Sequence, residues 1–178
     1  QLWSKLYAQL HLALVEVKDQ NDKIAIGVSF PEYRFNEEQG IGYLGSKLRL
    51  FATTEQELQK LDIKRWFEWL SDYTHISSIR EVPAHKITSY ATFSRKQVKT
   101  NPERLARHRV KRGDIDFAEA KARYQNVVTS SNLPFIQLKS LTNQQPFYLF
   151  IQKVNKDTLE AGSFSSYGLS ANASVPEF

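Results

Sequence analysis

The chain has 178 residues, 41% hydrophobic and 24% charged, a mix typical of one globular domain or two small ones. The absence of Cys excludes a disulfide scaffold and a thiolate metal site, and no apolar run approaches the roughly 18 residues of a membrane span, so we expect a cytoplasmic protein. The net charge is +5, yet eight Lys or Arg and one acid fall between Arg95 and Arg112, so the remaining residues sum to −2.

The first half of the chain alternates between helix and strand signals. Apolar residues at helical spacing predict a helix over residues 2–17, and a capping box at Thr54–Glu57 predicts a second helix that ends near Leu70. Residues 32–45 are polar and glycine-containing, which predicts a loop. Strands are predicted at residues 24–30, 47–52 and 75–82. The predicted order is therefore α-β-β-α-β.

The second half is first basic and then rich in strand signals. Residues 90–99 are expected to be extended or looped, and Asn101-Pro102-Glu103 is typical of a helix start, with Gly113 ending that helix. Asp116 is placed to cap a second helix with an apolar stripe. Short strands are predicted at residues 135–139, 147–153 and 163–169, with a polar turn at residues 140–146.

The predicted basic helix gathers its charges on one stripe. Arg107, His108 and Lys111 lie within about 60° of Arg104 on a helical wheel, and Arg112 flanks them. Like charges at these spacings repel, and a polyanion would relieve the repulsion. We favour nucleic-acid binding because the whole charge excess lies in this segment, while a solvated basic face stays open as the alternative. Charge alone does not separate DNA from RNA.

Histidine has the unperturbed pKa best suited to proton transfer near neutral pH. The chain has His11, His75, His85 and His108. His11 falls on the edge of the first helix's apolar stripe, where it could point into a cleft, although the residues alone favour an ordinary boundary position. No acid cluster or Cys/His spacing indicates a metal site, and the acids at residues 114–116 suit helix capping. We therefore expect no metal and no cofactor.

Six segments of the chain, taken in order, carry a family resemblance. They are "LHLAL" (10–14), "IGVSFP" (26–31), "NPERLARH" (101–108), "SNLPF" (131–135), "FYLFI" (147–151) and "SSYGLS" (165–170). The set resembles the CRISPR repeat-cleaving endoribonucleases of type I-F systems, the Csy branch of the Cas6 superfamily, over essentially the whole chain. The resemblance implies an α+β fold, with a ferredoxin-like domain over residues 1–87 and an RNA-hairpin-binding domain with an arginine-rich helix over residues 88–178.

The resemblance also implies a reaction and a set of site residues. Such enzymes bind the CRISPR repeat stem-loop, cleave precursor CRISPR RNA at the base of the hairpin by 2′-hydroxyl attack without a metal, and retain the product. The implied catalytic residues are His11, Ser140 and Tyr167. The implied RNA-binding residues are Arg95, Gln97, Arg104, Arg107, His108, Lys111, Arg112 and Phe147. The helix would lie along the major groove of the stem. Without the resemblance, the serine is a turn residue and the two aromatics are core residues.

The chemistry of the RNA-binding residues fits the roles that the resemblance implies. By the resemblance, Arg95 and Gln97 would read base edges near the foot of the stem, and both chemistries fit, since Arg is bidentate to guanine and Gln to adenine. Phe147 would stack on the last base pair, as aromatics commonly do in RNA recognition. Other subunits of a type I-F surveillance complex are expected partners.

Two departures from the family pattern stand out. Ala106, His108 and Gly113 occupy positions that are often basic in the family. The family's first domain runs β-α-β-β-α-β, so a strand is expected before Gln1. Two other functions stay open. One is a non-cleaving RNA-hairpin-binding subunit of a ribonucleoprotein complex. The other is a DNA-binding regulator, which the acidic start of the second helix disfavours.

Overall fold

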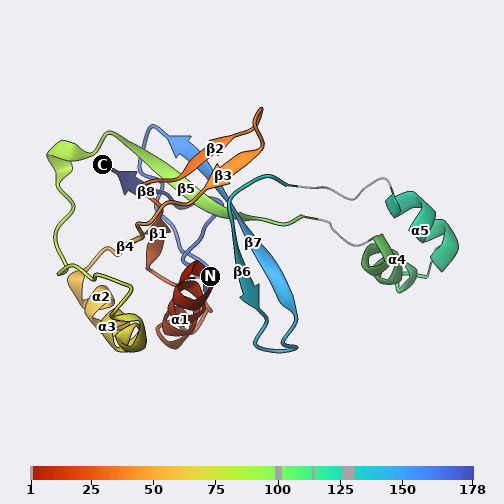
Figure 1. Ribbon diagram of the computed structural model, residues 1–178, viewed down its shortest axis with the longest axis horizontal. Coiled ribbons are helices and arrows are strands. Elements are labelled where there is room, and N and C mark those ends of the chain that lie inside the picture. The colour runs from red at the N-terminus through yellow and green to blue at the C-terminus, as the bar shows by residue number, and fades with distance from the viewer. Residues whose placement is uncertain (1, 99–101, 114, 126–130) are drawn as a thin grey trace. The chain divides into compact units, whose positions relative to one another are not determined.

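The computed structural model describes residues 2–98, 102–113, 115–125 and 131–178, apart from the side chains at 102, 104 and 125 (Figure 1). Its helices are α1 (Leu2–Glu16), α2 (Glu55–Leu61), α3 (Ile63–Trp66), α4 (Pro102–Val110) and α5 (Phe117–Gln125), with short 3₁₀ turns η1 (Glu68–Leu70) and η2 (Ala84–Lys86). Its strands are β1 (Gly27–Ser29), β2 (Arg34–Asn36), β3 (Ile41–Tyr43), β4 (Arg49–Phe51), β5 (Ser89–Lys96), β6 (Phe135–Lys139), β7 (Pro146–Lys156) and β8 (Val175–Glu177).

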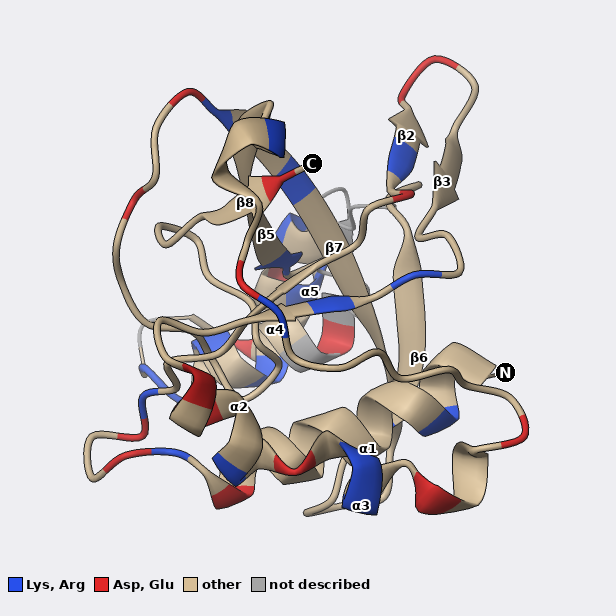
Figure 2. Cartoon of the chain, turned by 90° about the vertical axis from the view of Figure 1, so that its left-hand side faces the viewer, with Lys and Arg blue, Asp and Glu red and all other residues tan. Residues whose placement is uncertain are grey.

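The chain divides into two compact units. The main unit comprises Gln1–Arg95 and Leu133–Phe178, and the helical unit comprises Lys96–Asn132. By sequence the main unit has 15 basic and 15 acidic residues, interspersed in Figure 2, whereas the helical unit has nine basic and four acidic residues. The entire net charge of the protein thus belongs to the helical unit. The boundary expected after residue 87, between a ferredoxin-like domain and an RNA-hairpin-binding domain, stays a prediction.

The main unit is organised around a four-stranded sheet in the order β6-β7-β5-β8. β6 and β7 form an antiparallel hairpin from Phe135↔Phe150 to Lys139↔Pro146, with the predicted turn between them. β8 is an edge strand antiparallel to β5, and no strand was predicted there. Its Pro176 explains the omission, because proline is confined largely to edge strands, where its missing N–H is tolerated.

Helix α1 lies against β6 and supplies one side of the core. Its Tyr7, Leu10 and Leu14 are fully buried, as the helical spacing predicted. They belong to the same buried cluster as Ile136 and Leu149, which point inward from β6 and β7 because alternate residues of a strand face opposite sides. The position of each α1 side chain is therefore set by packing along the whole helix.

The predicted strands around residues 24–30 and 47–52 are confirmed as β1 and β4, an antiparallel pair shorter than expected. The capping box is confirmed, since Thr54 and Glu57 exchange side chain-to-backbone hydrogen bonds. The helix does not continue to Leu70, however, because Asp62 adopts a left-handed backbone (φ 45°) that separates α2 from α3. The predicted loop at residues 32–45 contains the small β2–β3 hairpin.

Two predicted strands are wrong. Residues 75–82 form neither helix nor strand, and most are exposed, because no neighbouring strand accepts their backbone hydrogen bonds. Residues 163–169 form only a single bridge, Ile24↔Phe164, followed by a tight turn. The apolar residues of these segments were read as strand signals, but strand formation needs a partner that local sequence does not reveal.

The helical unit consists of the two helices predicted from capping signals. The Asp116 carboxylate accepts a 2.8 Å hydrogen bond from the Glu119 amide and caps α5 as expected, while the predicted cap Asn101 lies outside the described residues. α4 and α5 pack together with Ala106 and Ala120 buried.

The helices and sheets of the described residues together confirm the α+β class. The ferredoxin-like arrangement and the strand before Gln1 stay predictions.

Candidate active site

His11 is fixed by two neighbours in the main unit. It is half-buried beside the fully buried Leu10 of α1, at the edge of the apolar stripe, as predicted. Its Nδ1 lies 2.8 Å from the Ser166 carbonyl oxygen. Because a carbonyl can only accept, Nδ1 carries the hydrogen in this bond. In the neutral imidazole Nε2 then holds the free lone pair, which is the state a general base requires.

The ring of Tyr167 stacks on that of His11. The ring centroids lie 4.3 Å apart with an interplanar angle of 10°. Burial raises the pKa of the Tyr167 phenol, and the nearby Arg95 guanidinium opposes this shift only in part. The phenol therefore stays neutral near physiological pH. Stack and hydrogen bond together restrict both the tilt and the rotation of the imidazole.

The segment that holds His11 is itself a tight turn. The Ser165 amide donates to the Leu169 carbonyl, and the Gly168 amide donates to the Ser165 carbonyl, each at 2.8 Å. The Tyr7 hydroxyl donates a 2.8 Å hydrogen bond to the Tyr167 carbonyl. Burial raises the pKa of this Tyr7 hydroxyl well above its ordinary value, so it keeps its hydrogen. A buried residue of α1 thus ties the turn to the helix that carries the histidine.

Arg95 connects this site to a second aromatic. Its guanidinium carbon lies 5.9 Å from the centroid of the Tyr167 ring and 5.3 Å from that of Phe147. These distances fit cation–π contacts. Arg95 is exposed, and Phe147 is half-buried against the core, as its strand position also predicted. The structure thus places four of the predicted site residues in one continuous chain of contacts: Phe147, Arg95, Tyr167 and His11.

Ser140 is the predicted site residue that stands apart. It opens the β6–β7 turn, where its amide donates to the Gln145 carbonyl and its carbonyl accepts from the Gln144 amide. No hydrogen bond of its hydroxyl and no contact with His11 or Tyr167 is present within the described residues. The hydroxyl is therefore available, but its catalytic role stays a prediction.

The other predicted RNA-binding residues belong to the helical unit. His108, Lys111 and Arg112 are exposed, and so is Gln97 in the segment that precedes α4. Arg107 is exposed and lies 3.6 Å from Glu103, a loose ion pair. The Arg104 side chain lies outside the described residues. The helix ends at Val110, three residues before the predicted Gly113, so Lys111 and Arg112 lie in the turn that follows it. Exposed cations on a short helix and its following turn are suited to phosphate contacts.

Metal-ligand clusters and membrane-spanning helices are both absent from the described residues. Those residues contain no group of three or more His, Asp or Glu side chains placed to hold a metal ion. No helix formed by the described residues is long and apolar enough to cross a membrane.

Sequence reasoning missed three contributors to the site. They are the Ser166 carbonyl, the Tyr7 hydroxyl and the positive φ of Gly168 (68°). All three act on residues 165–169, the turn that holds His11 and is called the histidine turn below. The segment "SSYGLS" was singled out, and its glycine was the available signal of a left-handed backbone position. A backbone carbonyl leaves no signal in the residue type, so the partner of His11 could not have been read from the sequence.

Fold and site define an α+β protein that combines an oriented imidazole on a charge-neutral unit with a basic helical unit. The chain belongs to the family described as "CRISPR-associated protein (Cas_Csy4)", which matches residues 1–178. It is 39% identical to the "CRISPR-associated endonuclease Cas6/Csy4" of Escherichia coli (strain UTI89 / UPEC), over 99% of this chain and 90% of that protein. It is 38% identical to the protein of the same name from Pseudomonas aeruginosa (strain UCBPP-PA14), over 100% of this chain and 90% of that one. The family predicted from the sequence is confirmed.

Proposed function

We propose that this protein is a metal-independent endoribonuclease that binds the CRISPR repeat stem-loop and cleaves precursor CRISPR RNA at the base of the hairpin. The observation that carries the proposal is the hydrogen bond from His11 Nδ1 to the Ser166 carbonyl. It leaves Nε2 as the proton acceptor. The endonuclease names of the two relatives support the reaction class.

In the proposed mechanism the RNA supplies its own nucleophile. His11 Nε2 removes the proton from the 2′-hydroxyl of the nucleotide before the cut, and the resulting oxyanion attacks the adjacent phosphorus. The leaving 5′-oxygen takes a proton from solvent, which gives a 5′-hydroxyl on one fragment and a 2′,3′-cyclic phosphate on the other. Addition of water to the cyclic phosphate then gives a 3′-phosphate. Ser140 holds the attacking nucleotide's ribose, and Tyr167 keeps the imidazole in plane.

Binding is assigned to both units. The exposed cations Arg107, Lys111 and Arg112, together with Arg104, contact phosphates along the stem, and Arg95 with Gln97 reads bases at its foot. Phe147 stacks on the last base pair, and Arg95 lies over this ring, so stacking and base reading are coupled at one place. The enzyme keeps the cleaved hairpin and joins other subunits of a type I-F surveillance complex. The alternative is a subunit that binds the hairpin without cutting it.

The test uses the host's repeat RNA, intact or with a single 2′-deoxy nucleotide before the cut. Intact RNA should be cut in excess chelator, and the 2′-deoxy RNA should be bound but not cut. His11→Ala should lower the rate by about 10²–10⁴ without weakening binding, because the general base is lost while the phosphate contacts remain.

The matched control is His75→Ala. His75 is exposed to solvent and makes no hydrogen bond or ring contact in the described structure, so this variant should cut at the wild-type rate. Cleavage that requires Mg²⁺, or a 5′-phosphate on the product, contradicts the mechanism. Binding without cleavage by the wild type would favour the alternative. Wild-type rates in His11→Ala would move the base to another histidine.

A further inference from the structure

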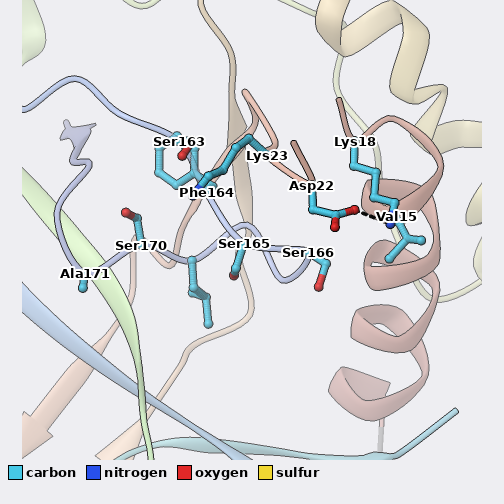
Figure 3. Close-up of a pocket in the computed structure, with 11 residues that line it drawn as sticks. Val15, Lys18, Asp22, Lys23, Ser163, Phe164, Ser165, Ser166, Ser170 and Ala171 are labelled. Carbon is cyan, nitrogen blue, oxygen red and sulfur yellow. Dashed lines mark ion pairs between the residues drawn. The ribbon is translucent and has the colours of Figure 1, made fainter. Parts of the chain in front are cut away.

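A hollow of about 570 Å³ opens in the main unit beside the histidine turn (Figure 3). The end of α1 and the loop after it form one wall, and the chain on both sides of Tyr167 forms the other. The polar side chains that line it are Lys18, Asp22, Lys23, Ser163, Ser165, Ser166 and Ser170. Neither the proposed cleavage mechanism nor the proposed stem contacts use this hollow.

The two walls are held together by the bridge between Ile24 and Phe164. Phe164 donates its amide to the Ile24 carbonyl at 2.9 Å, and its ring packs against the core. Since alternate residues of an extended segment point to opposite sides, Ser163 and Ser165 face away from the core and into the hollow. Lys23 precedes Ile24, and its amide is fixed by a 2.8 Å hydrogen bond to the Asp19 carboxylate. The wall is therefore ordered before any ligand arrives.

The serine hydroxyls of the hollow have hydrogen atoms left to donate. The Ser165 oxygen accepts from the Tyr167 amide, and the Ser170 oxygen accepts from the amides of Asn172 and Ala173. These hydroxyls are used as acceptors, so their O–H groups remain free. The hydroxyls of Ser163 and Ser166 have no hydrogen bond within the described residues. Several donors without acceptors suit a ligand that is rich in acceptor oxygens.

The charges of the hollow point to an anion. Lys18 and Asp22 form an ion pair at 2.6 Å, which lowers the pKa of the Asp22 carboxyl and cancels one positive charge. Lys23 makes no ion pair with any described residue, so its charge is uncompensated. One ammonium among serine hydroxyls is the arrangement that binds a phosphate oxygen through charge-assisted and neutral hydrogen bonds.

The hollow continues the chain of contacts in the active site. That chain runs from Phe147 through Arg95 and Tyr167 to His11. Ser166 extends it, because its carbonyl binds His11 while the same residue lines the hollow. If the foot of the stem lies at the Phe147 end, RNA that passes His11 reaches the hollow next.

We infer that this hollow binds the backbone phosphates of single-stranded RNA on the 3′ side of the cut. The inference rests on the proposed function, which places the stem foot at Phe147 and the scissile phosphate at His11. Lys23 supplies the charge and the serines supply donors, so recognition is of the backbone and tolerates any base. The hollow would hold the leaving strand while the new 5′-hydroxyl forms.

The test compares the affinities of two RNAs that cannot be cut because the nucleotide before the cut is 2′-deoxy. One ends one nucleotide beyond the cut, and the other continues for several more. Wild-type protein should bind the longer RNA about three- to tenfold more tightly, the gain expected of one or two hydrogen bonds to phosphate. Lys23→Ala should bring this ratio close to one. It should also reduce the salt slope for the longer RNA by about 0.7, the value for one contact to a single strand.

The matched control is Lys60→Ala, which removes another exposed lysine of the main unit that has no described ion pair and lies outside the hollow; it should keep the wild-type ratio. Replacing the phosphates beyond the scissile one by neutral methylphosphonates should abolish the ratio in the wild type. A wild-type ratio of one, a Lys23→Ala ratio equal to that of the wild type, or a ratio that survives methylphosphonates overturns the inference. Failure to bind either RNA refutes the proposed function itself, and the subsite with it.

Discussion

Gly168 offers the sharpest test of how the turn orients the histidine. Its φ is +68°, and an added Cβ would overlap the Cγ1 atom of Val28, a fully buried core residue. For an alanine the left-handed backbone costs roughly 1–2 kcal/mol, and overpacking of a core costs roughly 1–3 kcal/mol more. Gly168→Ala should therefore lower the free energy of unfolding by about 2–5 kcal/mol, and the melting temperature by roughly 4–20 °C.

The same substitution should affect catalysis more than RNA binding. Relief of the overlap must shift the backbone next to Tyr167 and Ser166, which hold the His11 ring by stacking and by hydrogen bond. A displacement on the order of 1 Å can cost about 10²-fold in rate. We expect the single-turnover cleavage rate at saturating RNA, measured at a temperature well below the melting point, to fall at least about tenfold. Hairpin affinity should change by less than about threefold, because Gly168 has no predicted phosphate contact.

A double-mutant cycle with Val28→Ala separates backbone strain from steric overlap. Val28→Ala removes the atom that the new Cβ would meet, so the double variant should be less destabilised than the sum of the single variants by about 1–3 kcal/mol. Gly113→Ala is the control for the backbone cost alone, since Gly113 has φ +82° and open space where its Cβ would lie. Calorimetry or urea unfolding supplies the energies. Additive effects of the two substitutions within about 0.5 kcal/mol would refute the assigned overlap.

Three further predictions concern charge, base reading and pH. Alanine at Lys111 or Arg112 should each reduce the log–log salt slope of hairpin binding by roughly 1, and an unchanged slope would mean that the turn after α4 faces solvent. Arg95→Ala and Gln97→Ala should each cost about 1–3 kcal/mol of discrimination, read as the affinity ratio between the cognate stem and one with exchanged lower base pairs; equal losses for both stems would exclude base reading. The pKa of the Tyr7 hydroxyl is raised in the folded state, so the stability that this shift contributes is present below about pH 10 and is lost above it. Tyr7→Phe should therefore flatten the fall of the unfolding free energy at alkaline pH, measured by urea unfolding. A fall parallel to that of the wild type would contradict this.

Local signals predicted the elements that depend on their own residues. The stripe of α1, the capping box at Thr54 and the cap at Asp116 were all read correctly, because each is decided within one or two helical turns. The early end of α2 at Asp62 was missed, since aspartate is only an occasional left-handed residue and nothing nearby marks it. Residues 75–82 were wrongly read as a strand because they carry a local strand signal but have no neighbouring strand to pair with.

The candidate site also contains some features that the sequence reveals and others that only the fold reveals. His11 and Tyr167 were named from motifs, and the structure brings them into contact although they are 156 positions apart in the sequence. The Ser166 carbonyl that fixes the histidine tautomer could not be named, because every residue has such a carbonyl and only the fold selects one. Side-chain chemistry is visible in sequence, whereas backbone chemistry becomes visible only once distant segments are placed together.

The main-chain partner of His11 determines which substitutions the site tolerates. Because the partner of His11 is a main-chain oxygen, substitution of the Ser166 side chain leaves that hydrogen bond chemically intact. What protects the bond is the turn geometry, which depends on Gly168 and on the Tyr7 hydroxyl within the core. The orientation of His11, the proposed general base, is therefore expected to be more sensitive to two residues with no proposed contact to RNA than to the residue whose oxygen holds the histidine.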